Sequence, residues 1–166
     1  MQATCPPKGG PFRLACAPGP LRPILSLFLR PVLALMDLQE RLAAVIERKR
    51  GSGERMLVDL RAISDFSWDT LYIFTPYTPI ETVRDALGFD WPKAAEIEIN
   101  KRDDINLLVF VSRGEVVQFL EYPRSRGDFY KVREPYGLAC DEAVFEVKEE
   151  DHGQPWLVLY ALAPAS

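Results

Sequence analysis

The sequence is poor in histidine and lacks the common nucleotide and redox motifs. It contains one histidine, His152, which falls in a predicted hairpin turn and is expected to be solvated there. A Ser-His-Asp triad, a Cys-His pair or a histidine-rich zinc site would have to use this one side chain. No phosphate-binding glycine loop, dinucleotide fingerprint or Cys-x-x-Cys pair is present. The sequence therefore predicts no catalytic residue, no metal site and no cofactor, and it favours a protein that is not an enzyme.

Cysteine is also scarce. Of the three cysteines, Cys5 and Cys16 lie in the first 35 residues, so residues 36–166 contain only Cys140. No disulfide framework can form within that part of the chain, which fits a reducing compartment. We therefore expect a cytoplasmic protein, with the cell envelope as the alternative.

The first 36 residues contain no acidic side chain. Their four basic residues give this segment a charge of about +4. Because the net charge of the whole chain is −4, the remaining residues together carry a charge of about −8. Nonspecific nucleic-acid binding needs cations that replace the counterions condensed on phosphate. The acidic body of the chain therefore argues against a nucleic-acid partner.

No apolar run is long enough to cross a bilayer. Residues 24–36 (ILSLFLRPVLALM) are apolar, but Arg30-Pro31 interrupts them and neither half approaches the ~20 residues of a spanning helix. The run lacks a polar face and a small-x-small cleavage site, so membrane contact is not expected. Seven of the fourteen prolines lie in residues 1–31. We predict that residues 1–35 are a disordered extension, or sequence upstream of a start at Met36, and that 36–163 form one domain.

Two helices are predicted. Asp37 followed by Glu40 resembles a capping box, and leucine, valine and isoleucine recur behind it at helical spacing up to the glycines at 51 and 53. This pattern predicts a helix over 37–50. Pro79 opens a second helix, which is expected to end before Gly88.

The rest of the domain has strand patterns separated by short turns. Apolar, aromatic and β-branched runs predict strands at 55–61, 70–75, 96–99, 105–111, 116–122, 129–133, 143–148 and 156–162. The run at 105–111 is apolar on both faces, which is typical of a central strand. Short turns between successive strands force antiparallel pairing. The predicted fold is therefore α+β, with a mostly antiparallel sheet of about five to seven strands and two helices.

The aromatic stretch 66–78 is the most unusual part of the sequence. In one interpretation, Trp68, Tyr77 and their polar neighbour Asp69 line a recognition surface, where amphipathic aromatic side chains are favoured. In the other, Trp68 packs in the core and Asp69 caps a turn. Arg124 and Arg126 would either hold an anionic group or pair with the acidic surface. These five residues are the candidate binding residues.

The same stretch resembles a group of small bacterial proteins of uncharacterised function, some of them predicted lipoproteins. The pattern is Phe-x-Trp-Asp-x-x-Tyr-x-Phe-x-Pro-Tyr-Thr over 66–78, then a short helix ending near Gly88, then the Leu-Leu-Val-Phe-Val strand at 107–111. The resemblance covers about residues 55–130 and implies a bacterial origin and a compact domain. It implies no activity and no catalytic residue, and the lipidated cysteine of some members has no match here.

Three functions are compatible with the sequence. The first is a noncatalytic protein-interaction module, favoured by the acidic body and the aromatic turns. The second is a small hydrolase or ligand-binding enzyme that uses carboxylates, with candidates Asp65, Asp69, Glu81 and Asp104. The third is a peripheral envelope protein held by residues 22–36. We rank them in this order.

Overall fold

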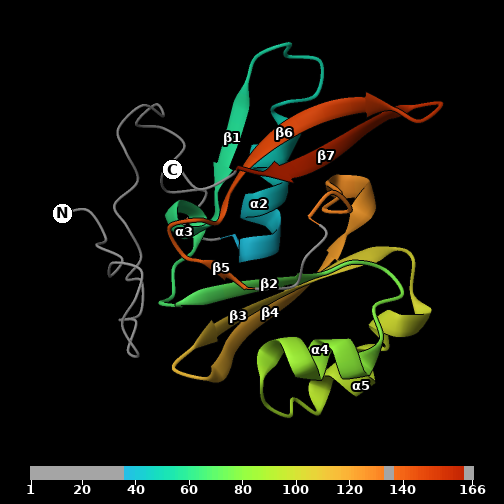
Figure 1. Ribbon diagram of the computed structural model, residues 1–166. Helices are drawn as coiled ribbons and strands as arrows, with labels where there is room; N and C mark the ends of the chain where they lie inside the picture. Colours follow the sequence, from blue (N-terminus) through green and yellow to red (C-terminus); the bar gives the residue numbers. More distant parts are fainter. Residues whose placement is uncertain (1–35, 133–136, 163–166) are drawn as a thin grey trace.

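The computed structural model describes residues 36–132 and 137–162, which form an α+β fold with two antiparallel sheets (Figure 1). The described residues contain seven strands, at the upper end of the predicted number. They are divided between a four-stranded and a three-stranded sheet, whereas the short turns had predicted one sheet. The predicted extension at 1–35 lies outside the described residues.

The four-stranded sheet has the order β4-β3-β2-β5, and the predicted central strand lies inside it. Its members are β2 (Thr70–Phe74), β3 (Ile105–Ser112), β4 (Glu115–Pro123) and the two-residue β5 (Leu138–Ala139). Every residue of β3 except its last is buried, because both faces of the sheet are covered. The hairpin β3–β4 turns at Arg113-Gly114, where both residues have positive φ, as a type I′ turn requires.

The three-stranded sheet has the order β1-β6-β7. It consists of β1 (Met56–Asp59), β6 (Val144–Asp151) and β7 (Pro155–Ala161), and β6–β7 is the predicted C-terminal hairpin. The predicted strand 55–61 ends early because the Asp59 carboxylate accepts hydrogen bonds from the amides of Arg61 and Ala62. That N-cap starts a short helix, α3 (Leu60–Ile63).

Helices cover both faces of the four-stranded sheet. On one side α2 (Leu38–Glu47) lies between the two sheets, and the Asp37 carboxylate accepts its Glu40 amide at 2.8 Å, as the capping box predicted (Figure 1). On the other side lie α4 (Ile80–Leu87) and α5 (Lys93–Ile97). Two 3-10 turns complete the fold, η1 (Ile99–Lys101) and η2 (Arg124–Arg126).

Successive side chains of β2 and β3 point to opposite faces of the sheet and pack into two separate hydrophobic cores. Leu71, Leu108 and Phe110 face α2 and the three-stranded sheet, and they belong to the larger core. Phe74 and Leu107 face the other way and pack beneath α4 and α5. A strand with apolar residues on both faces was therefore needed at this position.

Two predicted strands were wrong. Residues 96–99 alternate in polarity, but Pro92 precedes a helical turn, and this segment forms the end of α5 and the start of η1, with Glu98 in the left-handed region. Residues 129–132 form no strand, and residue 133 lies outside the described part. Among the described residues, none of the helices has the length and apolar character needed to span a membrane.

Candidate functional site

Two of the five candidate binding residues lie in the interior. Trp68 is 1% exposed, packs edge-on against Phe110 and donates its indole N–H to Ser64 Oγ at 3.0 Å. Asp69 is 9% exposed, and its Oδ2 accepts the Arg113 amide at 2.8 Å. In the structure, these side chains occupy the core and turn-capping positions of the second interpretation.

The other three candidates lie on two other segments: Tyr77 in the turn after β2, and Arg124 and Arg126 in η2. Tyr77 is 60% exposed and has φ = 62°, and its amide donates to the Ile99 carbonyl at 3.0 Å. Arg124 binds the buried Asp128 carboxylate, and Arg126 forms a two-bond pair with Glu40 on α2 at 2.6 and 2.9 Å. The structure does not bring the five residues into one site.

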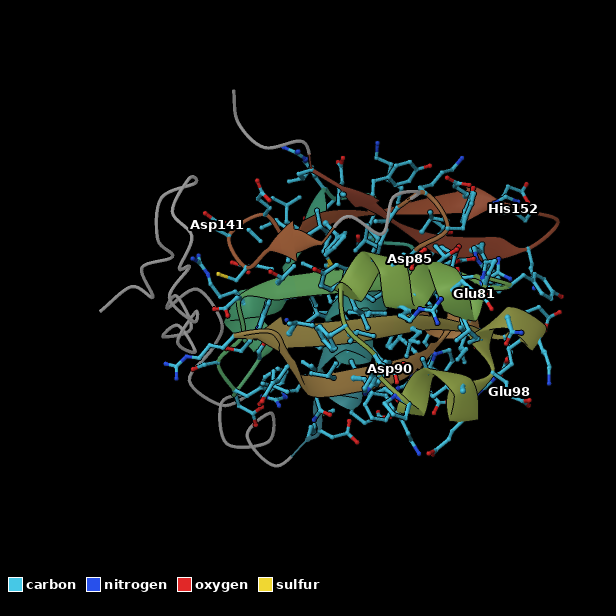
Figure 2. The ribbon with its side chains drawn as sticks, turned by 60° about the horizontal axis from the view of Figure 1, so that its bottom comes forward. Glu81, Asp85, Asp90, Glu98, Asp141 and His152 are labelled. Atoms are coloured by element: carbon cyan, nitrogen blue, oxygen red, sulfur yellow. The ribbon has the colours of Figure 1, made fainter. Side chains whose placement is uncertain are left out.

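The candidate catalytic carboxylates are also separated. Asp65 pairs with Arg41 at 2.9 Å, and Asp104 pairs with Arg102, which holds the pKa of Asp104 below its usual value through a side-chain hydrogen bond. Glu81 is exposed on α4, as Figure 2 shows. Within the described residues, no group of three or more histidine, cysteine or carboxylate side chains is arranged to hold a metal ion.

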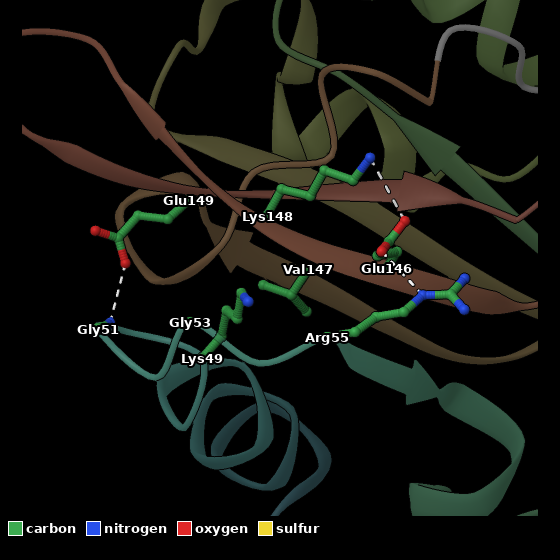
Figure 3. Close-up of a pocket in the computed structure, with 8 residues that line it drawn as sticks. All are labelled: Lys49, Gly51, Gly53, Arg55, Glu146, Val147, Lys148 and Glu149. Atoms are coloured by element: carbon green, nitrogen blue, oxygen red, sulfur yellow. Dashed lines mark hydrogen bonds and ion pairs between the residues drawn. The ribbon is translucent and has the colours of Figure 1, made fainter.

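A cavity of about 500 Å³ lies between β6 and the segment that joins α2 to β1 (Figure 3). Most of the charged residues that line this cavity are paired with one another or with the backbone. Glu146 forms ion pairs with Arg55 at 3.0 Å and with Lys148 at 3.5 Å, and Glu149 accepts a hydrogen bond from the Gly51 amide at 3.1 Å. A charged ligand would have to compete with these pairs. A smaller cavity of about 370 Å³, next to α2, is lined by the Glu40–Arg126 pair. Neither cavity is lined by a candidate carboxylate.

The outer edge of β4 has backbone groups that no strand of the described sheet pairs with. β4 is the terminal strand of its sheet, and the Phe119 amide points away from β3, because it donates to Gln118 Oε1 at 3.1 Å. Phe119 lies opposite Val109 of β3. Because the Phe119 amide does not bond to β3, Phe119 and Val109 form a pair without backbone hydrogen bonds. In an antiparallel ladder, pairs without hydrogen bonds alternate with pairs that exchange two hydrogen bonds. Phe119 and Glu121 therefore direct their backbone donors and acceptors toward this edge.

The side chains along this edge are apolar in the middle and charged at the ends. Val117 is 46% exposed and is the extra residue of a β-bulge, since Gln118 lies opposite Phe110 and Val116 opposite Val111. Phe119 packs edge-on against Trp91 at 5.4 Å between ring centroids. Glu115 and Pro123 end the strand, which is typical of protected sheet edges.

The other sheet edges in the described part of the chain are shorter or partly occupied. β5 has two residues and β1 has four. The edge of β7 is bridged by Asp128, whose amide donates to the Leu157 carbonyl at 2.9 Å while its carbonyl accepts the Leu159 amide at 2.8 Å. The nine-residue β4 is thus the longest edge available for pairing with another strand.

A second polar group of residues, which the sequence did not predict, lies on the β6–β7 hairpin. The Glu150 carboxylate accepts hydrogen bonds from the hydroxyls of Tyr130 (2.7 Å) and Tyr160, and His152 Nε2 lies 2.9 Å away. The two tyrosine hydroxyls, that of Tyr160 first, lower the pKa of Glu150 to about 2, and the same carboxylate raises the pKa of Tyr160 to about 12. His152 lies near the tip of this hairpin in Figure 2.

This tyrosine–glutamate cluster satisfies its own polar groups. Lys131 lies over the Tyr130 ring and Lys148 over the Tyr160 ring, each with Nζ 4.7 Å from the centroid. These cations occupy ring faces on which a positively charged ligand would otherwise bind. The cluster could not be predicted from the sequence, because Tyr130, Glu150 and Tyr160 lie far apart along the chain and meet only in the folded structure. These hydrogen bonds favour a structural role, in which Glu150 attaches the segment around Tyr130 to the β6–β7 hairpin.

Comparisons with known proteins give no relative: no protein-family model matches the chain, and neither a similar curated protein nor a similar solved structure was found.

Proposed function

We propose that this chain is a noncatalytic protein-interaction module that binds an extended segment of a partner along the edge of β4. The observation that carries the proposal is the Phe119 amide, which points out of the sheet and is bonded only by the side chain of its own neighbour, Gln118. A side-chain amide is easily displaced by a backbone carbonyl. Strand addition of this kind gains affinity from main-chain hydrogen bonds and specificity from alternate side chains.

The apolar centre of the edge supports this proposal. Val117 is one of the few large apolar side chains with high exposure, and Phe119 extends the second core toward the same edge. An added strand would cover both while pairing the outward backbone groups. The carboxylate-based enzyme is less favoured, because Asp65, Glu81 and Asp104 lie on separate elements and two of them are engaged by arginines.

Site-specific photo-cross-linking in the source cells tests the proposal. A photoreactive phenylalanine analogue would replace Val117 in one variant and Leu57 in the other. Leu57 is the matched control, because it is also 46% exposed and also lies on an edge strand, β1. We expect a defined cross-linked protein, mapped to an extended segment by mass spectrometry, from position 117 and not from position 57.

Two results would contradict the proposal: no product at position 117, or the same products from both positions. The cytoplasmic location expected from the sequence is part of the proposal, and fractionation of the same cells tests it. Recovery of the untagged protein in the envelope fraction would favour the peripheral envelope protein instead.

A further inference from the structure

We infer that the partner segment that adds to β4 is a basic segment of another protein. A bulky apolar side chain of this segment pairs with Phe119, and a lysine or arginine two residues before it pairs with Glu121. This inference rests on the proposed function and names the chemistry of its partner. It follows from the backbone groups, the side chains and the charges of the second half of β4.

The second half of β4 has a regular set of outward backbone groups. From Gln118 to Pro123 its register with β3 is unbroken, because the bulge lies before Gln118. Phe119 and Glu121 alternate here with residues that bond to β3, so both direct their N–H and C=O away from the sheet. Pro123 is the next outward position and has no N–H to donate. An added strand therefore forms its backbone hydrogen bonds in this half with Phe119 and Glu121.

The side chains of these two residues lie on the face of the sheet that α4 and α5 cover. Phe119 packs against the core beneath these helices and edge-on against Trp91, with ring centroids 5.4 Å apart. Residues that pair directly across two strands place their side chains on the same face, where aromatic and β-branched side chains pair favourably. The partner residue opposite Phe119 therefore lies beside both rings, which favours a bulky apolar side chain.

The charges next to this half of the strand are mainly negative. β4 contains two glutamates and no basic residue. Arg102 binds two carboxylates, that of Glu121 at 2.5 Å and that of Asp104 at 2.7 Å, so this group keeps one negative charge. Asp90, which precedes Trp91, is exposed and forms no ion pair within the described part of the chain. A cation opposite Glu121 is therefore attracted, whereas a carboxylate in that position is repelled.

The strand direction places this cation in the partner sequence. All strand pairs of the two sheets are antiparallel, and we take the added strand to continue this pattern. The residue opposite Glu121 then lies two positions before the residue opposite Phe119. On the same face, Lys93 and Glu96 form an ion pair of 2.5 Å that adds no net charge. The partner segment thus has the pattern basic-x-apolar.

The test is fluorescence anisotropy of the full chain with three labelled peptides. The first is Ser-Thr-Lys-Thr-Phe-Thr-Val-Thr-Ser, which has this pattern among strand-forming residues. The second has glutamate in place of lysine, and we expect it to bind about 2- to 30-fold more weakly, since an attractive pair becomes a repulsive one. The third is the first peptide with an N-methyl group on its phenylalanine. It lacks the amide that would donate to the Phe119 carbonyl, so its binding should be about 2- to 13-fold weaker.

Two variants of the protein assign the charge preference to Glu121. Glu121→Gln removes the carboxylate and should bring the dissociation constants of the lysine and glutamate peptides together. Glu146→Gln is the matched control, because Glu146 is also a strand carboxylate held by an arginine, at 3.0 Å from Arg55, but lies on β6 in the other sheet. It should keep the wild-type ratio. Circular dichroism would confirm that each variant folds.

Equal binding of the lysine and glutamate peptides to the wild type would overturn the basic partner, as would no binding of either at about 1 mM peptide. A charge preference that persists in Glu121→Gln would overturn the pairing with Glu121. A dimer of the protein alone in sedimentation velocity would assign the edge to a second copy instead.

The N-methyl peptide separates this inference from the proposed function. If it binds as tightly as its parent, the contact is not strand addition, and the proposed function is contradicted as well. If it binds more weakly while the lysine and glutamate peptides bind equally, strand addition stands and only the inferred charge of the partner is wrong.

Discussion

Asp128 and Arg124 form an ion pair of 2.7 Å in which the carboxylate side chain is fully buried and the guanidinium side chain is 30% exposed. The same carboxylate accepts hydrogen bonds from the indole of Trp156 at 3.2 Å and from the amide of Asn106 at 3.3 Å. Trp156 lies on β7 and Asn106 on β3. Asp128 therefore links the segment after η2 to both sheets.

Replacing Asp128 by alanine should be strongly destabilising. The change would leave the Trp156 and Asn106 donors without their acceptor and Arg124 without its charge partner, and breaking such a buried pair costs about 3–5 kcal/mol of unfolding free energy. Urea unfolding would measure the change. Asp104→Ala is the matched control, because Asp104 also pairs with an arginine, Arg102, but its side chain is 59% exposed and Arg102 keeps its second partner, Glu121, so the loss should cost less than about 1 kcal/mol. Equal losses in the two variants would contradict the structural role of Asp128.

The sequence predicted the elements whose signals are local. Asp37 and Glu40 mark the start of α2 within four residues, and the run at 105–111, which is apolar on both faces, identifies the central strand. The helix α4 ends before Gly88, as predicted, and Gly88 has the left-handed conformation that favours glycine. Such signals arise from hydrogen bonds and side-chain contacts between near neighbours in the chain, so they can be read before the fold is known.

The features that depend on distant pairing could not be predicted in this way. The division into two sheets follows from β1 pairing with β6, about ninety residues away, while β2 pairs with β3. The role of Arg124 likewise depends on a buried carboxylate, and exposed and buried aspartates look the same in a sequence. The free edge of β4 was not visible either, because a hairpin pattern does not show which of its strands is terminal.

Gly127 is expected to tolerate no side chain. It has φ = 153°, and a Cβ atom there would lie 2.9 Å from Ile46 Cδ1 and 3.1 Å from Leu159 Cδ1, between α2 and β7. Gly127→Ala should therefore destabilise the fold by about 1–3 kcal/mol, through overpacking and an unfavourable backbone conformation. Gly53→Ala is the control: it shares the positive φ but has no atom within 4 Å of the added Cβ. Thermal unfolding of both variants would separate the steric from the backbone cost, and a smaller loss for Gly127→Ala than for Gly53→Ala would contradict the packing seen here.

Substitution of Trp68 should destabilise the fold, whereas substitution of Tyr77 should have almost no effect on stability. Trp68→Phe removes the hydrogen bond to Ser64 and part of a fully buried ring system, so we expect a loss of about 1–3 kcal/mol in unfolding free energy. Tyr77→Ala removes a 60% exposed side chain and should change stability by less than about 0.5 kcal/mol. Denaturant titration would show both effects. If Tyr77→Ala cost as much as Trp68→Phe, Tyr77 would have packing contacts that its exposure does not suggest.

The tyrosine–glutamate cluster predicts a stability difference that depends on pH. The pKa of Glu150 is lowered from 4.5 to about 2, first by the Tyr160 hydroxyl and then by the Tyr130 hydroxyl. A carboxylate with a depressed pKa in the folded state stabilises the fold fully above its unfolded-state pKa, and this contribution disappears as the pH falls through the folded-state pKa. The wild type should therefore have a higher Tm than Glu150→Gln at neutral pH, and the gap should close between about pH 4.5 and pH 2.

Thermal unfolding at a series of pH values measures this gap, and Tyr160→Phe supplies the second comparison. That variant keeps the carboxylate but removes the hydroxyl that lowers its pKa most, so its Tm should fall toward that of Glu150→Gln and its pH dependence should move to higher pH. Other acidic groups titrate in all three proteins and cancel in the differences. A gap between wild type and Glu150→Gln that stays constant down to pH 2 would mean that ionisation of Glu150 contributes nothing to stability, and it would contradict this prediction.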